Sequence, residues 1–289
     1  MTIDLFPDLR APLARMTNDA VDALVTQYGA LFETISTAIL SVLLVVEHGL
    51  RAVPPVVLIA AVGAIAFYAS RKPFFSVAAA LGMWLIGALG MWDQAMQTLA
   101  IILVAVAISV VIGMPLGIAA ASSAAVRRIL MPLLDLMQTI PSFVYLIPAA
   151  MLFGLGKVPA ILATVVYAAP PLIRLTDLGI REVDYAVVEA SRAFGATRWQ
   201  ILSGVQIPLS LPAIMQGINQ TTMLALSMVV IASMIGARGV GETVLLGLQR
   251  NDSGMGLVGG LTIVVLAVVI DRITQAYGQR LQRHRKAGA

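Results

Sequence analysis

Long stretches without a charged side chain dominate this sequence, and they constrain its fold more than any other feature. Two of them run for 33 and 39 residues, over 94–126 and 199–237. A helix needs about 20 apolar residues to cross the hydrocarbon core of a bilayer. Charged residues make up 12% of the chain, about half of what a soluble domain carries. The sequence therefore predicts an all-α integral membrane protein.

We expect about seven transmembrane helices. Each expected span is an uncharged run that ends at or beside a charge, and together they cover 52–70, 73–92, 94–126, 136–156, 158–173, 199–237 and 253–270. Residues 34–46 form one more uncharged run, but its 13 residues are too few to span. Together with residues 20–33, this run is interpreted as an amphipathic helix at the membrane interface. A short, tilted extra span is the alternative.

Basic residues set the expected orientation. With the N-terminus outside, the inner loops and tail hold 13 Lys and Arg and the outer loops hold 6, which is the bias of the positive-inside rule. We therefore expect the C-terminus in the cytoplasm. The expected parts are an acidic leader with the interfacial helix (1–51), two accessory transmembrane helices (52–92), a core transmembrane domain (93–275) with a cytoplasmic loop (181–208), and a basic cytoplasmic tail (276–289).

No catalytic or metal-binding set is visible in the sequence. Cysteine is absent, and the two histidines are isolated. The sequence GLGKV at 154–158 lacks the hydroxyl residue and the earlier glycine of a nucleotide-binding loop. Ion-coupled pumps place ionisable groups at mid-depth, whereas Arg174, Asp177 and Asp271 lie at span ends, where we expect interfacial anchoring. The energy for transport must then come from outside this chain, or the protein is passive.

Glycine and proline mark three further features. The spacing of Gly113 and Gly117 predicts close helix packing. Prolines between 141 and 171 predict kinked helices of the kind that a transporter needs. The glycine-rich segment 236–256 falls on the outer side, where it forms either a packed loop or a gate or docking surface for an outside protein.

Residues 181–212 predict a helix, a tight turn and a second helix between two spans. An apolar stripe at helical spacing predicts the first, amphipathic helix; its members are Val183, Val187, Ala190 and Phe194. Gly195 predicts a turn in the left-handed conformation. Thr197 and Gln200 predict a capping box that opens a second short helix running to about Ile207.

The same loop resembles a cytoplasmic loop in the permease subunits of ABC importers, with the pattern E-A-A, three residues, G, nine residues, I-x-L-P. The matching residues are Glu189, Ala190, Ser191, Gly195, Val205, Ile207 and Pro208. The departures from the pattern, at 191, 205 and 207, are conservative. The flanking sequences MQTIPSFVYLIPAAMLFGLGKVPAILATVVYAAPPLIRLT and NQTTMLALSMVVIASMIGARGVGE are similar to permeases for glycine betaine, proline, choline and related quaternary ammonium osmolytes. The resemblance covers roughly residues 50–280.

The resemblance implies a type I ABC importer permease in a bacterial cytoplasmic membrane, which is a translocation subunit and not an enzyme. It implies a permease homodimer in the lipid bilayer, an extracytoplasmic substrate-binding protein, and separate ATPase subunits that bind ATP and Mg and seat the loop around Glu189 in a groove. No cofactor is expected in this chain, and no nucleic-acid partner.

Phe143, Tyr145 and Tyr167 are the aromatic candidates for contact with a quaternary ammonium along the path, with packing in the membrane core as their competing role. Four other functions stay open at this stage. They are an ion-coupled secondary carrier, a passive channel, a membrane-embedded enzyme, and an ABC permease for another small solute such as an amino acid.

Overall fold

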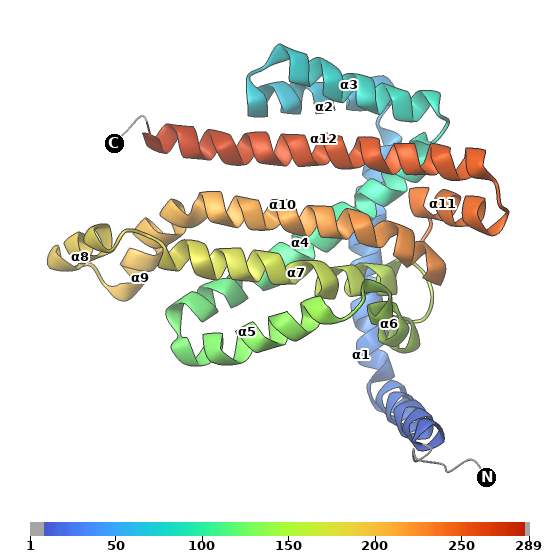
Figure 1. Ribbon diagram of the computed structural model, residues 1–289, viewed down its shortest axis with the longest axis horizontal. Helices are drawn as coiled ribbons and strands as arrows, with labels where there is room; N and C mark the ends of the chain where they lie inside the picture. Colours follow the sequence, from blue (N-terminus) through green and yellow to red (C-terminus); the bar gives the residue numbers. More distant parts are fainter. Residues whose placement is uncertain (1–8, 287–289) are drawn as a thin grey trace, which may run out of the picture.

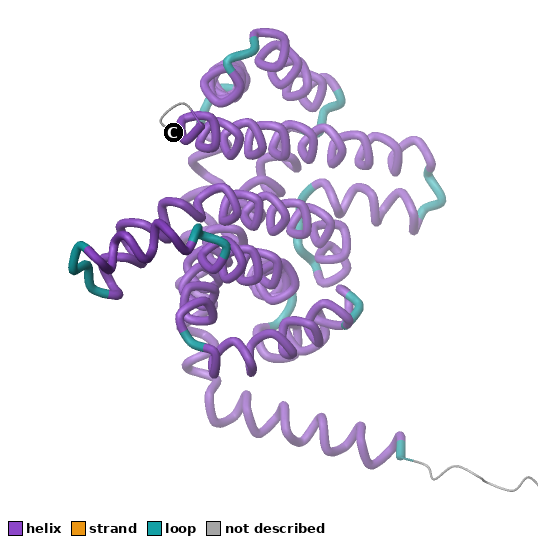
Figure 2. Tube along the Cα trace, turned by 60° about the vertical axis from the view of Figure 1, so that its left-hand side comes forward, coloured by secondary structure: helices purple, strands orange, loops and turns teal. Residues whose placement is uncertain are grey.

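A computed structural model describes residues 9–286, with side chains for residues 9–278. Every regular element in this part of the chain is a helix, and the connections are short (Figure 2). The prediction of an all-α membrane protein is therefore confirmed. Asp4 and Asp8 of the acidic leader, and the tail side chains from residue 279 onward, lie outside what the structure describes.

The centre of the protein is formed by α4 (Trp92–Ser122), α7 (Lys157–Arg181) and α10 (Ile207–Ala232). Helix α7 packs against both of the others, and most of its residues are buried. A Cβ atom at Gly117 would lie 2.6 Å from Cβ of Thr176, and one at Gly113 would lie 3.3 Å from Leu172. The predicted packing role of this glycine pair is confirmed, because a larger residue at 117 would force α4 away from α7.

A hairpin of two short helices, α2 (Pro55–Ser70) and α3 (Pro73–Ala88), lies against α12 (Ser253–Lys286) (Figure 1). Each helix of the hairpin has 16 residues, which reach about 24 Å at 1.5 Å per residue. The hydrocarbon core is about 30 Å thick. The two expected accessory spans therefore exist as apolar helices, but both are shorter than a full span.

The uncharged run 136–156 is a bent element, not one straight span. Helix α5 (Ala124–Thr139) ends before Pro141, and the chain turns through 107° into η1 (Ser142–Tyr145) and α6 (Leu146–Phe153). Proline disfavours helical conformation in the residue before it and has no N–H to donate. The prediction of kinked helices is confirmed here, whereas the predicted bounds of this span are wrong.

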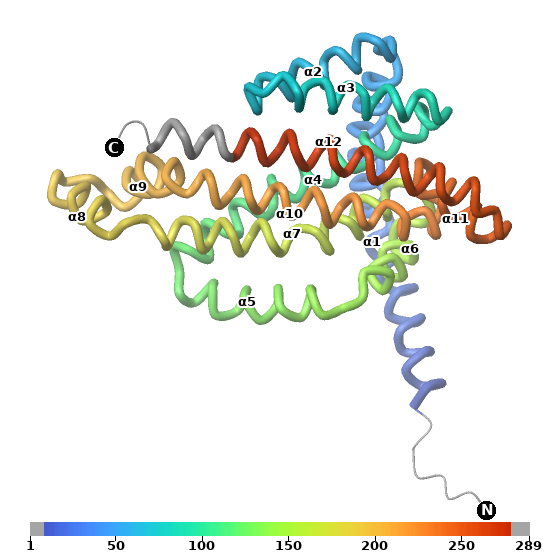
Figure 3. Tube along the Cα trace, turned by 45° about the horizontal axis from the view of Figure 1, so that its top comes forward, coloured from blue at the N-terminus to red at the C-terminus, as the bar shows by residue number. Residues whose placement is uncertain are grey.

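Helix α1 (Arg10–Ala52) is a single helix of 43 residues. It runs crosswise to α7, α10 and α12, as Figures 1 and 3 both show. Leu43 is fully buried against α4 and α7, and the rings of Phe32 and Phe153 are 5.2 Å apart. By length and composition α1 could cross a membrane, in line with the alternative expectation of an extra span in this region. Its crosswise direction suits the predicted interfacial helix better, because a helix spanning with the others would run along them.

Among residues 9–278, five helices are long and apolar enough to cross a membrane, and six if the bent pair counts as one span. They include α4, α7, α10 with the segment before it, and α12, which match four of the seven expected spans. The fifth is α1. The difference from seven arises because α2 and α3 are short and the run 136–156 bends.

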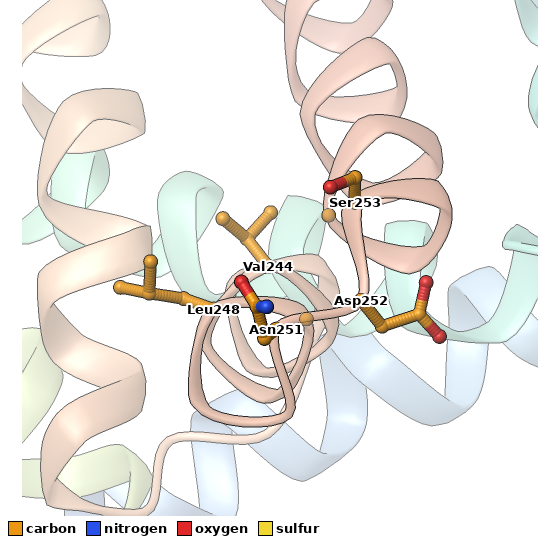
Figure 4. A pocket seen from close by; sticks show the side chains of 7 residues that line it. Val244, Leu248, Asn251, Asp252 and Ser253 are labelled. Atoms are coloured by element: carbon orange, nitrogen blue, oxygen red, sulfur yellow. The ribbon is translucent and has the colours of Figure 1, made fainter.

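Helix α11 (Val240–Gln249) turns back against α12 at the end of the bundle opposite α8 and α9 (Figure 1). A Cβ atom at Gly247 would lie 2.5 Å from the backbone nitrogen of Gly256, so these two helices pack with almost no space between them. Figure 4 shows the small pocket of about 260 Å³ beside their turn, with Leu248 and Asp252 pointing in opposite directions. This geometry agrees with a packed segment, and a role as gate or docking surface stays a prediction.

Candidate functional site

The segment around Glu189 forms an arm that extends beyond the ends of the spans (Figure 1). Its first helix is α8 (Tyr185–Ala193), which begins where the Asp184 carboxylate accepts a hydrogen bond of 2.9 Å from the backbone N–H of Ala186. The arm lies at the same end of the bundle as the C-terminal end of α12. The arm and the C-terminal end of α12 are thus on one side, as the expected orientation requires.

Gly195 forms the turn of the arm. Its φ is +80°, in the left-handed region that glycine enters without strain. The N–H groups of Gly195 and Ala196 donate to the carbonyls of Arg192 and Ser191, at 2.9 and 3.1 Å. These bonds close the C-terminus of α8, and the predicted left-handed turn is confirmed.

The predicted capping box is also confirmed. The Thr197 hydroxyl accepts from the N–H of Gln200 at 3.3 Å, and the Gln200 side chain accepts from the N–H of Thr197 at 2.8 Å. The expected end of the second helix near Ile207 is wrong. Helix α9 (Arg198–Ile201) continues through a π-helical turn, η2 (Leu202–Gln206), into α10. Pro208 comes just after this π-helical turn, and the helix runs on through it into α10, so the arm is a direct extension of a span.

Three of the four members of the predicted apolar stripe face outward, whereas Val183 lies before α8 and is half-buried. Val187 is 41% exposed and Phe194 is 93% exposed, and Ala190 is also exposed. The buried residue of α8 is Val188, which the stripe does not include. Exposed apolar side chains on a segment outside the membrane are typical of a surface that binds another protein.

The motif residues lie on both sides of the turn in one folded unit, because α8 packs against α9 and η2. The Glu189 carboxylate accepts a hydrogen bond from the Tyr185 hydroxyl one turn earlier, and this bond raises the pKa of Tyr185. The Ser191 hydroxyl donates to the carbonyl of Val187 at 2.8 Å. Val205 and Ile207 are half-buried at the start of the span, and Pro208 is exposed.

The three aromatic candidates for the path do not form a cage. The rings of Tyr145 and Tyr167 are 6.3 Å apart at an interplanar angle of 51°. Phe143 is 56% exposed and has no ring contact with either of them among the described residues. The Tyr145 hydroxyl donates to the carbonyl of Met137 and so joins the two sides of the bend after α5. This bond agrees with packing, and a role of these residues in the path stays a prediction.

Three ionisable residues expected as interfacial anchors instead link helices. Asp177 is 3% exposed and pairs with Arg127 of α5 at 3.1 Å. Arg174 pairs with Asp135, so two ion pairs join α5 to α7. Asp271 accepts a hydrogen bond of 3.0 Å from Asn219, which joins α12 to α10.

A cluster of charges at the other end of the bundle was missed by sequence reasoning. The carboxylate of Glu47 on α1 is buried and lies 2.7 Å from the Lys157 amine at the start of α7. Arg51 lies 3.7 Å from Glu47 and 3.2 Å from Asp93 at the start of α4. The only signal in the sequence was that each of these charges borders an apolar run.

Comparisons with known proteins agree on one family. The family model described as "Binding-protein-dependent transport system inner membrane component" matches residues 113–283. The chain is 46% identical to a glycine betaine/proline betaine transport system permease protein of Escherichia coli, over 96% of this chain and 78% of that protein. It is 43% identical to a glycine betaine transport system permease protein of Bacillus subtilis, over 92% of this chain and 94% of the other.

A third relative is a glycine betaine/carnitine transport permease protein of Listeria monocytogenes, at 44% identity over 93% of this chain and 96% of that protein. Among solved structures, the fold is similar to a chain of the MetNI methionine ABC transporter in an inward-facing conformation. The TM-score is 0.56 at 27% identity, over 65% of this chain and 92% of that chain.

Proposed function

The chain belongs to the family of inner-membrane components of binding-protein-dependent transport systems, and we propose that it is the permease subunit of an ATP-driven importer for betaine-type osmolytes. It is a permease and not an enzyme. In this proposal, separate ATPase subunits bind ATP and Mg, an extracytoplasmic binding protein delivers the solute, and two copies of this chain enclose the path. The N-terminus lies outside and the C-terminus in the cytoplasm of a bacterial inner membrane.

The observation that carries the proposal is the arm from α8 through Gly195 to α9. Its apolar stripe is exposed and its turn is fixed by hydrogen bonds. Because α9 continues into α10, a push on the arm moves a span of the core directly. These are the properties that a contact with a separate motor subunit requires.

The proposed solute class rests on the relatives. The permeases reported above carry glycine betaine, proline betaine or carnitine in their names, and each of these solutes pairs a quaternary ammonium with a carboxylate. Proline, which lacks the quaternary ammonium, and choline, which lacks the carboxylate, stay predictions. One observation supports an amino acid as the alternative solute, namely the similar fold of a methionine transporter chain. Its identity to this chain and its coverage of it are lower than those of the betaine permeases.

The proposed mechanism is alternating access. ATP binding closes the two ATPase subunits, and the arms seated on them transmit this closure to α10. The tight contact of Gly179 with Ala213 passes it on to α7, and the contact at Gly117 passes it on to α4. The path then opens outward to receive solute from the binding protein. Hydrolysis of ATP separates the ATPase subunits and returns the path to the inward-open state.

The test is transport by the purified complex in vesicles. We expect uptake of glycine betaine that requires ATP on the cytoplasmic side and a loaded binding protein, and that persists when an ionophore removes ion gradients. ATPase activity should rise with binding protein loaded with glycine betaine but not with methionine. Uptake driven by an ion gradient without ATP would identify a secondary carrier instead, and stimulation by methionine alone would assign the solute to the amino acids.

A further inference from the structure

Helix α10 carries exposed polar side chains in the middle of a span. Gln216, Gln220 and Ser227 are all exposed, and Met223 between them is 39% exposed. Their spacing of four, three and four residues places all four on one face of the helix. Gln220 stands near the midpoint of α10, which runs from Ile207 to Ala232.

The exposed faces of two other spans are different. Within the apolar part of α4 the exposed residues are Leu103, Ala107, Val111, Ile112, Pro115 and Leu116, and within that of α12 they are Leu257, Leu261, Val264 and Val268. All ten are apolar, as contact with lipid requires. Polar side chains within a membrane span face the interior of an assembly or a water-filled cavity. The face of α10 that carries Gln220 therefore turns toward water and away from lipid.

The glutamine amides are free to bind a solute. Within the described residues, neither the Gln216 nor the Gln220 amide makes a hydrogen bond, whereas the Ser227 hydroxyl donates to the carbonyl of Met223 at 3.1 Å. Unpaired amides at mid-depth are costly unless water or a ligand satisfies them. These two side chains therefore indicate the part of this α10 face that contacts water.

A groove continues the polar face toward the arm. It has a volume of about 450 Å³ and lies between the cytoplasmic parts of α7 and α10. Because the two helices are antiparallel, Gln216 of α10 lies at the deep end, beside Leu175, and Glu182 lies at the end next to α8. Gln216 also borders a smaller cavity of about 120 Å³, to which α12 contributes Thr274 and Gln275.

The position of α10 explains why this face is open. Helices α7, α4 and α12 all pack against α10, and in Figure 1 α10 lies between α12 and α7 with α4 behind. The side of α10 that carries Gln220 is exposed in a single copy of the chain. A second copy placed opposite would enclose the polar face without burying it against lipid.

We infer that Gln216, Gln220, Met223 and Ser227 form one wall of the solute path, which continues through the groove to Glu182, and that this wall selects a neutral zwitterion. The inference rests on the proposed function. The glutamine amides donate N–H groups to a solute carboxylate, and the soft thioether of Met223 contacts the methyl groups of a quaternary ammonium. No fixed charge stands on this face of α10, so binding is weak enough for the solute to leave, as conduction requires.

The test of the wall uses the absence of native cysteine. Gln216→Cys, Gln220→Cys and Ser227→Cys are compared, in the complete complex in vesicles, with Val111→Cys on α4 and Val264→Cys on α12. The two controls are also exposed in one copy, but they lie on the apolar faces expected to contact lipid. A charged, water-soluble thiol reagent should react about tenfold faster or more at the three α10 positions, because it does not enter hydrocarbon. Rates at Gln216→Cys and Gln220→Cys no higher than those of the controls would overturn the inference.

The test of selection uses Gln220→Leu, with Gln220→Asn as the variant that keeps an amide and Val264→Leu as the control. Uptake of labelled glycine betaine should fall about tenfold or more in Gln220→Leu, which corresponds to the loss of one hydrogen bond to a charged group. Assembly with the ATPase subunits and ATPase activity without solute should not change, and Gln220→Asn should retain most of the uptake. Normal uptake by Gln220→Leu would contradict the role in selection.

The experiments distinguish a failure of the proposed function from a failure of the assigned α10 wall. If the unmodified complex carries a solute other than a betaine, the proposed solute class fails, but the labelling pattern still decides whether α10 lines a path. If the unmodified complex transports glycine betaine and the α10 positions do not react, the proposed function stands and the assignment of the wall is wrong.

Discussion

Replacement of Gly195 tests the transmission of force through the arm. A Cβ atom at this position would meet no atom within 4 Å, so only the backbone conformation opposes a side chain. An L-residue in the left-handed region costs roughly 1–2 kcal/mol, which lowers the ratio of correctly to incorrectly turned arms by a factor of about 5–30. Gly195→Ala should therefore reduce transport by several fold. Gly195→Asn should reduce it less, because asparagine tolerates this region.

Proline is the severe case. Its ring fixes φ near −65°, whereas Gly195 has a φ of +80° and donates an N–H to the Arg192 carbonyl. Gly195→Pro should abolish transport and the stimulation of ATPase activity by loaded binding protein. Membrane insertion and dimer formation should be normal, because the turn lies outside the packed core.

The matched control is Gly204→Ala. Gly204 is also free of contacts within 4 Å, but its φ is not in the left-handed region. Uptake and stimulated ATPase activity should be measured in vesicles at equal protein levels, and the control should be close to normal. Normal, coupled activity of Gly195→Pro would show that the arm does not transmit the closure of the ATPase subunits, and the reasoning would fail.

Three further predictions concern stability and topology. Lys157→Met should lower the stability of the purified complex by about 3 kcal/mol, because it leaves the buried Glu47 carboxylate without its closest partner. In a thermal unfolding assay, adding Glu47→Gln should recover part of the loss. Equal melting temperatures of Lys157→Met and the unmodified complex would show that the pair contributes nothing. Tyr145→Phe should lower the stability of the complex by about 1 kcal/mol through the lost hydrogen bond across the bend, with normal glycine betaine uptake per folded complex. Reduced uptake at unchanged stability would instead assign Tyr145 to the solute path. In intact cells, Thr197→Cys should resist an impermeant thiol reagent and Ser253→Cys should react, and labelling of the former from outside would reverse the assigned orientation.

The parts of the arm that sequence predicted correctly depend on neighbouring residues. The turn at Gly195 and the capping box of Thr197 and Gln200 are satisfied within a few positions of the chain. The end of the second helix was wrong because Pro208 suggests a break, whereas the π-helical turn just before it carries the helix on into α10. The stripe on α8 was correct in its spacing, but spacing alone does not show whether a partner outside the chain covers it.

The features that sequence missed depend on contacts between distant residues. Lys157 and Glu47 are 110 positions apart and pair only because α1 crosses the start of α7. The same crossing decides how α1 lies, and an apolar run carries no information about its direction. The bend at Pro141 was expected as a kink, but its size of 107° depends on how α6 packs against α1 and α7.

The distribution of charge agrees with the proposal that a separate motor drives this permease. The ion pairs of the described residues lie near the ends of the spans, where Glu47 with Lys157 fixes one end of α7 and Asp177 with Arg127 fixes the other. Between these ends, the exposed polar groups of α10 are neutral amides and a hydroxyl. The amides and the hydroxyl of this wall do not gain or lose a proton near neutral pH, so a proton gradient has no group on it to drive. In the proposed mechanism the arm is the route by which free energy reaches α10, because it is continuous with the helix that carries the wall.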